Sequence, residues 1–212
     1  MRFLVTAGPT REPLDPVRYL SNRSSGKMGY ALAEAAIEAG HRVTLISGPV
    51  TLEPPADAET VFVETGREMF DAVARRIGEA DAAIFCAAVA DYRPREESDQ
   101  KIKKATEEVT LTLVKNPDIL GSCRSEFGFE GLLVGFAAET ENLRANALDK
   151  LSRKGCDLLV ANDVGGRGIG FDSEENAVTV FSKNGSSESI GPARKREIAR
   201  RLIERMETAG GR

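Results

Sequence analysis

The chain has 212 residues, of which 41% are apolar and 29% charged, and its formal net charge is −4. This length suits one full-sized α/β domain, and the slightly acidic balance gives no overall attraction to nucleic acid or to an anionic membrane. No apolar run approaches the length of a transmembrane helix, and the first residues, MRFLVTAGPT, lack the apolar core of a signal peptide. We therefore expect a cytoplasmic protein with neither a nucleic-acid nor a membrane partner.

Short apolar runs alternate with amphipathic stretches along the chain. The alternation predicts strands at 2–8, 42–48, 60–65, 82–90, 108–114, 131–137 and 157–163. Amphipathic helices are predicted at 28–40, 67–80, 118–126, 142–154 and 193–207. A hairpin over 177–190, turning at Asn184 and Gly185, precedes the last helix. The predicted fold class is α/β, a three-layer α/β/α Rossmann-like sandwich around a mostly parallel sheet, with a C-terminal β-hairpin and helix, in one domain over 1–212.

Histidine and cysteine chemistry has little support. Cys86, Cys123 and Cys156 are widely spaced and form no CxxC pair, which favours buried free thiols over a metal site or a disulfide framework. The single histidine, His41, follows a helix-ending glycine at the start of a predicted strand. A helix-terminus or surface position is expected for it, which argues against a Ser-His-Asp triad.

Ligands of parallel sheets bind beyond the carboxyl ends of the strands. The polar segments that follow predicted strands are 8–27, 91–106, 115–118, 138–141 and 162–176. The longest acidic and basic run, DYRPREESDQKIKKATE (91–107), is too long for an ordinary connection in a compact domain. We expect it to be either disordered or functional.

The stretch RYLSNRSSGKMG (18–29) has the composition of an anion-binding turn. It is not a Walker A loop, because Ser21 stands at the glycine position and Met28 follows the lysine, and the GxGxxG fingerprint of dinucleotide-binding proteins is missing. Ser24 stands before a predicted helix whose N–H groups and dipole favour an anion. Arg18 adds positive charge, and Asn22 adds a neutral amide donor. A serine-capped helix with solvated cations is the alternative.

Three further clusters could serve a nucleotide. In AAVADY (87–92), small residues leave the backbone accessible to a flat ligand, and Asp91 could bind a ribose hydroxyl or a metal–phosphate. Lys101, in KIKK, could close over a triphosphate. Lys150 and Lys154 are spaced i,i+4 on one helix face. Taken singly, each could equally be a capping aspartate or a solvated lysine patch.

Taken together, these motifs resemble those of bacterial phosphopantothenate–cysteine ligases, also called phosphopantothenoylcysteine synthetases. The motifs that carry the resemblance, in chain order, are TAGPTREPLDPVRYLSNRSSGKMG, AAVADY, KIKK, VKNPDIL, GFAAET and LLVANDV. The resemblance implies a step of coenzyme A biosynthesis. CTP activates the carboxylate of 4′-phosphopantothenate as an acyl-cytidylate and releases pyrophosphate, and L-cysteine then displaces CMP to give phosphopantothenoylcysteine.

The resemblance also implies roles for particular residues. Asn22 would hold the acyl carbonyl and the acyl-cytidylate, and Lys101 would be a mobile catalytic lysine over the triphosphate. The other implied substrate-binding residues are Arg18, Ser24 and Ala88. The other implied nucleotide-binding residues are Ala87, Asp91, Val134, Gly135, Phe136, Lys150 and Lys154. Mg²⁺ would bind through the nucleotide phosphates, without a direct protein ligand.

The family further implies a homodimer in which each site uses both subunits, with the region around 108–114 and the loop before it as the expected contact. In many bacteria the domain is fused behind a flavin-dependent decarboxylase. Here the first motif begins within a few residues of Met1, so we expect a ligase-only chain without FMN, with any decarboxylase a separate or fused partner. Arg23 stands where the family often has histidine, and should leave the mechanism intact.

Two other functions compete with the ligase. A non-catalytic nucleotide-binding module would keep the fold but have little use for both Asn22 and Lys101. A dinucleotide-dependent oxidoreductase lacks its glycine fingerprint here, and none of Tyr19, Tyr30 and Tyr92 is followed four residues later by lysine.

Overall fold

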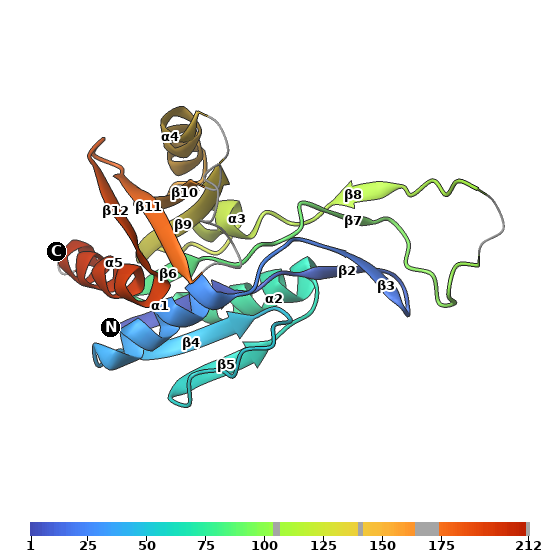
Figure 1. The fold of residues 1–212 in the computed structure, drawn as a ribbon, viewed down its shortest axis with the longest axis horizontal. Helices are drawn as coiled ribbons and strands as arrows, with labels where there is room; N and C mark the ends of the chain where they lie inside the picture. Colours follow the sequence, from blue (N-terminus) through green and yellow to red (C-terminus); the bar gives the residue numbers. More distant parts are fainter. Residues whose placement is uncertain (104–106, 140–141, 164–173, 211–212) are drawn as a thin grey trace.

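The structure, a computed structural model, describes residues 1–103, 107–139, 142–163 and 174–210. Its centre is an eight-stranded sheet (Figure 1). The strand order is β12 (Ser187–Arg194), β11 (Glu175–Ser182), β10 (Leu158–Asp163), β9 (Leu132–Glu139), β6 (Ala82–Phe85), β1 (Arg2–Ala7), β4 (Arg42–Ser47) and β5 (Ala58–Phe62). Pairing is parallel from β10 to β5, whereas β11 and β12 are antiparallel. The predicted mostly parallel sheet and the C-terminal hairpin are confirmed.

Helices cover both faces of the sheet (Figure 1). Helices α1 (Lys27–Glu38) and α5 (Lys195–Gly210) share one apolar core with the sheet. The opposite core contains residues of α2 (Gly66–Arg76), α3 (Ile119–Ser125) and α4 (Leu143–Arg153). The strand alternation shows the two faces directly, since Val5 belongs to the first core and Leu4 to the second. The predicted three-layer sandwich is therefore confirmed.

Two antiparallel strand pairs leave this body as an arm (Figure 1). One is the hairpin of β2 (Arg11–Asp15) and β3 (Arg18–Ser21), and the other pairs β7 (Tyr92–Pro94) with β8 (Leu113–Lys115). The arm carries exposed large apolar side chains, namely those of Val17, Tyr19, Tyr92, Val109, Leu111 and Leu113. Apolar area gathered on a projecting element is typical of a contact surface.

Two predicted strands differ from the structure. Strand 82–90 ends at Phe85, because its pairing with β9 stops there, while Cys86 still bonds to Thr6 of β1 and Ala88 pairs with the segment that follows β1. The prediction at 108–114 is largely wrong: only Leu113–Lys115 is a strand, and it pairs with β7 outside the main sheet. Its alternating valines and leucines resemble those of a half-buried strand, but in the described part of the chain no layer covers them.

Helix α1 lies unusually close to β1 because Gly29 has no side chain. A Cβ at Gly29 would lie 2.5 Å from Cβ of Ala7, which no real side chain tolerates. This contact sets the position of the N-terminus of α1 beside the carboxyl end of β1.

We predict that Gly29→Ala lowers the free energy of unfolding by about 1–3 kcal/mol, because overpacking outweighs the gain in helix propensity. Gly78→Ala is the matched control, since a Cβ there meets nothing within 4 Å. Urea unfolding monitored by circular dichroism measures both. A Gly29→Ala protein as stable as the Gly78→Ala protein would contradict the close approach.

Candidate functional site

Two adjoining cavities open at the carboxyl ends of the parallel strands. The first, of about 680 Å³, is lined by residues that follow β6 and β8 and by α3 and α4. Its lining includes Ala87, Asp91, Phe136, Lys150 and Lys154, all predicted to bind a nucleotide. The second cavity, of about 440 Å³, lies beside the N-terminus of α1, and its lining includes the predicted Asn22, Ser24 and Ala88.

A common wall separates the cavities. Ala87, Val89, Asp91, Phe136 and Lys150 line both of them. The two cavities therefore adjoin along residues 87–91. This arrangement suits a reaction that joins part of one ligand to part of another.

The wall is held in place by the end of β1 and by the segment that follows it. Thr6 Oγ1 accepts a hydrogen bond from the N–H of Ala87 at 3.3 Å, and Thr10 Oγ1 accepts one from Ala90 at 3.0 Å. Between them, the N–H of Ala88 donates to the carbonyl of Gly8 at 2.9 Å. Both threonines are buried, so these bonds are shielded from water. The small side chains of the wall then leave its backbone open to ligands.

Asn22 connects the RYLSNRSSGKMG stretch to this wall. Its Nδ2 donates to the carbonyl oxygens of Ala88 at 3.2 Å and Val89 at 3.1 Å. Two carbonyl partners identify this atom as the amide nitrogen, because an oxygen there would be repelled by both. Asn22 thus lies at the second cavity with its amide nitrogen hydrogen-bonded to the wall.

The N-terminus of α1 forms one side of the second cavity. Gly26 is the N-cap residue in a left-handed conformation (φ 77°) and supplies no side-chain cap. Ser24 Oγ accepts a long hydrogen bond, 3.4 Å, from the N–H of Gly26. Gly26, Met28 and Gly29 all line the cavity, so the positive end of the α1 dipole faces it.

The lysines of α4 lie at the first cavity. Lys154, whose side chain is only 13% exposed, forms an ion pair with Asp118, and Lys150 Nζ donates to the carbonyl of Phe136 at 3.0 Å. Burial acts to raise the pKa of Asp118, but the Lys154 hydrogen bond and the N–H of Gly121 outweigh it and lower that pKa. Asp118 therefore stays ionised, and Lys154 has a counterion until a ligand anion replaces it.

The loop between β8 and α3 was not assigned a role from the sequence. Lys115, Asn116, Pro117 and Asp118 line the first cavity. Asn116 Nδ2 donates to the carbonyl of Ala90 at 2.8 Å, which joins this loop to the common wall. From the sequence the segment is only a polar stretch after a predicted strand, although Asn-Pro-Asp before a helix is a capping signal that points to it.

Polar residues at the far side of the second cavity were also missed. Asn162, Asn176 and Lys195 line it together with Cys86. Asn176 and Lys195 are buried, at 2% and 7% exposure. Asn162 lies in the post-strand segment 162–176, but Lys195 stands within a basic helix that predicts only a solvated face. Nothing in the local pattern distinguishes Lys195 from the exposed cations around it.

Four predicted residues lie away from both cavities. Val134 and Gly135 are buried within β9, where a Cβ on Gly135 would contact Leu120 and Leu159. Arg18 and Lys101 belong to the arm, and neither lines either cavity. The structure thus brings Asn22, Ser24 and Ala88 together with Asp91 and the α4 lysines, but not with the two cations of the arm.

The cysteines are free, as predicted. Cys123 and Cys156 are buried, and burial raises their thiol pKa values to about 12 and about 11. Burial likewise raises the pKa of Cys86 to about 12, so this cavity-lining thiol is uncharged near neutral pH. His41 is hydrogen-bonded to the N-terminal amine at 3.2 Å and to Glu207 at 2.8 Å, far from either cavity.

Among the residues that the structure describes, no three histidine, cysteine, aspartate or glutamate side chains gather as a metal-binding group. No helix in the same part of the chain is both long and apolar enough to cross a membrane.

Known proteins similar to the chain agree with one another. The coenzyme A biosynthesis bifunctional protein CoaBC of Vibrio vulnificus is 46% identical over 99% of this chain and 52% of its own length, and that of Escherichia coli K12 is 45% identical over 96% and 50%. The chain therefore spans about half the length of the curated relatives it matches.

Solved structures extend this similarity. The crystal structure of a CoaBC C-terminal domain has a TM-score of 0.84 and 39% identity, covering 98% of this chain and 94% of the other. A Cab2 mutant in complex with phosphopantothenate-cysteine shares the fold, with a TM-score of 0.78 at 18% identity over 98% of this chain and 87% of the other.

The match to a family model covers nearly the whole chain. The family is described as the DNA/pantothenate metabolism flavoprotein C-terminal domain, and residues 1–209 match it. A match of this extent, together with relatives at 45% identity and above, shows that the protein belongs to this family of C-terminal domains.

Proposed function

We propose that the protein is a phosphopantothenate–cysteine ligase that uses CTP. The observation that carries the proposal is the pair of cavities with one shared wall at residues 87–91. The bifunctional coenzyme A biosynthesis relatives and the Cab2 complex with phosphopantothenate-cysteine support the same substrates. CTP is assigned to the first cavity and 4′-phosphopantothenate to the second, with their reacting groups at the wall.

The chemistry requires two displacements. A carboxylate oxygen of 4′-phosphopantothenate bonds to the α-phosphorus of CTP, and the bond to pyrophosphate breaks. The nitrogen of L-cysteine then bonds to the acyl carbon, the bond to CMP breaks, and the nitrogen loses a proton. Both steps concentrate negative charge, so cations and N–H donors at fixed positions lower their barriers.

Each part of the site has a role in these steps. The N-terminus of α1 and Ser24 would bind the anionic end of 4′-phosphopantothenate. Asn22 would hold the acyl oxygen, after one of its N–H groups leaves the carbonyl of Ala88 or Val89. Lys150 and Lys154 would bind nucleotide phosphates, with Lys154 leaving Asp118 to do so.

Mg²⁺ would accompany CTP. Asp91 and Asp118 are carboxylates in the first cavity, and hard cations prefer such oxygen donors. Their donor chemistry fits a Mg²⁺ ion that CTP would bring to the cavity, and the ion would supply additional neutralisation of phosphate charge.

The arm suggests how Lys101 reaches a site. Lys101 and Arg18 lie outside both cavities of their own chain, on an element with exposed valines, leucines and tyrosines. We therefore propose a homodimer in which the arm packs against a second copy, so that each site combines cavities from one subunit with arm cations from the other.

The ligase predicts pyrophosphate release when the protein is mixed with 4′-phosphopantothenate, Mg²⁺ and CTP. Less release is expected with ATP, and L-cysteine should convert the intermediate to phosphopantothenoylcysteine and CMP. A coupled pyrophosphate assay and mass spectrometry of the products measure these steps. CTP binding without pyrophosphate release, from a folded dimer, would instead support the nucleotide-binding module.

Removing either proposed catalytic side chain should abolish most turnover while preserving CTP binding. Asn22→Ala removes the donor to the acyl oxygen and should lower kcat by about 10²–10³-fold. Lys101→Ala removes the positive charge that would stabilise the leaving pyrophosphate, and it should lower kcat by at least the same factor. Calorimetric CTP affinities should stay within a few-fold. Lys183→Ala, an exposed lysine on the far hairpin turn, is the matched control, and a comparable loss there would refute the assignment.

Sites shared between subunits predict recovery of activity on mixing. In a heterodimer of Asn22→Ala and Lys101→Ala chains, one site would carry both changes and the other would carry neither. Random exchange of subunits should then restore about a quarter of wild-type activity. The assay is run after co-refolding the two variants, with each variant refolded alone as its control. No recovery, despite heterodimers detected by native mass spectrometry, would place Lys101 and Asn22 in the same subunit's site.

A further inference from the structure

Asp15 is a buried carboxylate at the tip of the β2–β3 hairpin. It ends β2, its side chain is fully buried at 0% exposure, and Arg18, its ion-pair partner, begins β3. Its Oδ1 accepts the N–H groups of Val17 and Arg18, each at 2.9 Å. These two bonds close the turn between the strands, as aspartate does in many tight turns.

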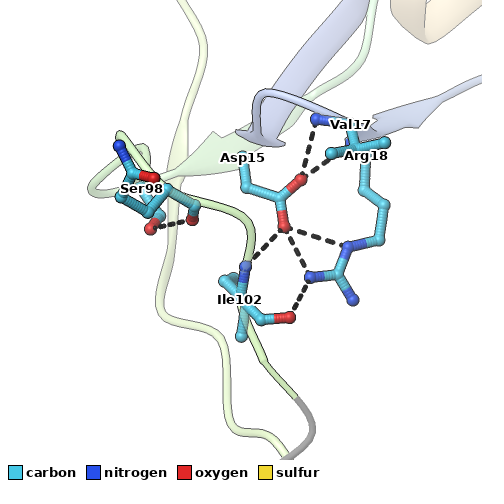
Figure 2. Close-up of polar contacts among 6 residues, drawn as sticks. Asp15, Val17, Arg18, Ser98 and Ile102 are labelled. Atoms are coloured by element: carbon cyan, nitrogen blue, oxygen red, sulfur yellow. Dashed lines mark hydrogen bonds and ion pairs between the residues drawn. The ribbon is translucent and has the colours of Figure 1, made fainter.

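The other oxygen of Asp15 serves a different purpose (Figure 2). Oδ2 accepts Nε of Arg18 at 3.0 Å and also Nη2, and it accepts the N–H of Ile102 at 3.1 Å. Nη2 of Arg18 in turn donates to the carbonyl of Ile102 at 2.9 Å. The Asp15–Arg18 ion pair thus binds both polar groups of Ile102, the residue directly after Lys101.

A second attachment holds the same segment to the hairpin. The N–H of Ser98 donates to the carbonyl of Leu14 at 3.1 Å, and Ser98 Oγ donates to the carbonyl of Gln100 at 2.7 Å. Residues 98–102 are therefore fixed to the hairpin on both sides of Lys101. The closed turn alone does not require these bonds, since Oδ1 already satisfies it.

The carboxylate is a strong anchor. The Arg18 hydrogen bond is the largest influence on the pKa of Asp15, burial opposes it, and the N–H groups of Ile102, Val17 and Arg18 add to it, so the pKa lies far below its usual range. Asp15 is therefore ionised at every pH suited to an assay. Bonds between a charged acceptor and charged or polar donors are stronger than neutral ones.

We infer that Asp15 is a positioning residue for Lys101, because its Oδ2 joins the backbone next to the lysine and the Arg18 side chain in one hydrogen-bonded unit. This inference rests on the proposed function for the role of Lys101. A rigid backbone on both sides of the lysine lets its ammonium group reach the leaving pyrophosphate without first ordering the segment. Nε and Nη2 of Arg18 are bonded to Asp15 and Ile102, so Nη1 is the atom of Arg18 that would bind a substrate.

Asp15→Asn tests the anchor selectively. An asparagine keeps one oxygen for the turn, but it places an NH₂ group against Arg18 and the N–H of Ile102. Hydrogen exchange in the peptide 96–103 should accelerate at least about tenfold. The segment no longer has to break these bonds to open, so the free energy of local opening is lower. In the same variant, kcat should fall by about 10–100-fold, while CTP affinity stays within a few-fold.

Asp81→Asn is the matched control. Asp81 also accepts a backbone N–H and an arginine side chain, both from Arg2, at 2.7 and 3.3 Å, but it lies at the opposite end of the sheet. In the Asp81→Asn protein, hydrogen exchange in residues 96–103 and kcat should both be unchanged. Should Asp15→Asn fail to fold, Ile102→Pro removes the donated N–H with the hairpin intact, and the same drop in kcat at unchanged CTP affinity is expected.

The outcomes separate the anchor from the ligase proposal. Unchanged exchange in 96–103 overturns the anchor, whatever the activity. Faster exchange with an unchanged kcat overturns the positioning role. A wild-type protein without ligase activity refutes the proposed function, whereas the exchange measurement still decides whether Asp15 holds the segment.

Discussion

The site depends on a strand that stops early. β6 lies at the centre of the sheet, yet it ends at Phe85: the next residues lose their pairing with β9 and keep bonds only to the end of β1 and the segment after it. Buried hydroxyls of Thr6 and Thr10 make this departure stable, because they accept N–H groups that would otherwise lose their partners. The result is a wall of small residues that both cavities share, and Asn22 and Asn116 are attached to its carbonyl groups from opposite sides.

Charge is organised locally in a chain that carries −4 overall. Two cations near the cavities have acidic partners: Lys154 pairs with Asp118 and Lys27 with Glu174. A buried or half-buried cation without a counterion is costly, so such pairing stabilises the folded protein. A polyphosphate ligand can then exchange one anion for another, which costs less than drawing a hydrated lysine out of water. Specificity for a polyanion is thus compatible with an acidic protein.

The sequence predicts well whatever depends on local pattern. Apolar runs located the strands of the main sheet, helical spacing located α1, α2 and α4, and polar residues after strands located Asn22, Ala88 and Asp91 at the cavities. Prediction from the sequence failed where the burial or bonding of a residue depends on residues far away in the chain. The alternation at 108–114 cannot show that no layer covers Val109 and Leu111, and a basic helix start cannot show that Lys195 is buried at a cavity. Asp15 was invisible for the same reason, since its partner Ile102 lies 87 residues away.

The arm is where the physical argument for a second subunit is strongest. An extended element of two antiparallel strand pairs has little core of its own. Its valines and leucines are exposed to water, and burying them in a contact would be favourable. A flexible arm would also be a poor carrier for a catalytic lysine, because each encounter would have to order it first. The buried Asp15–Arg18 pair counters this difficulty, since it stiffens the arm next to Lys101 with bonds internal to one chain. Contact with a second copy would then have only to place a lysine whose backbone is already ordered.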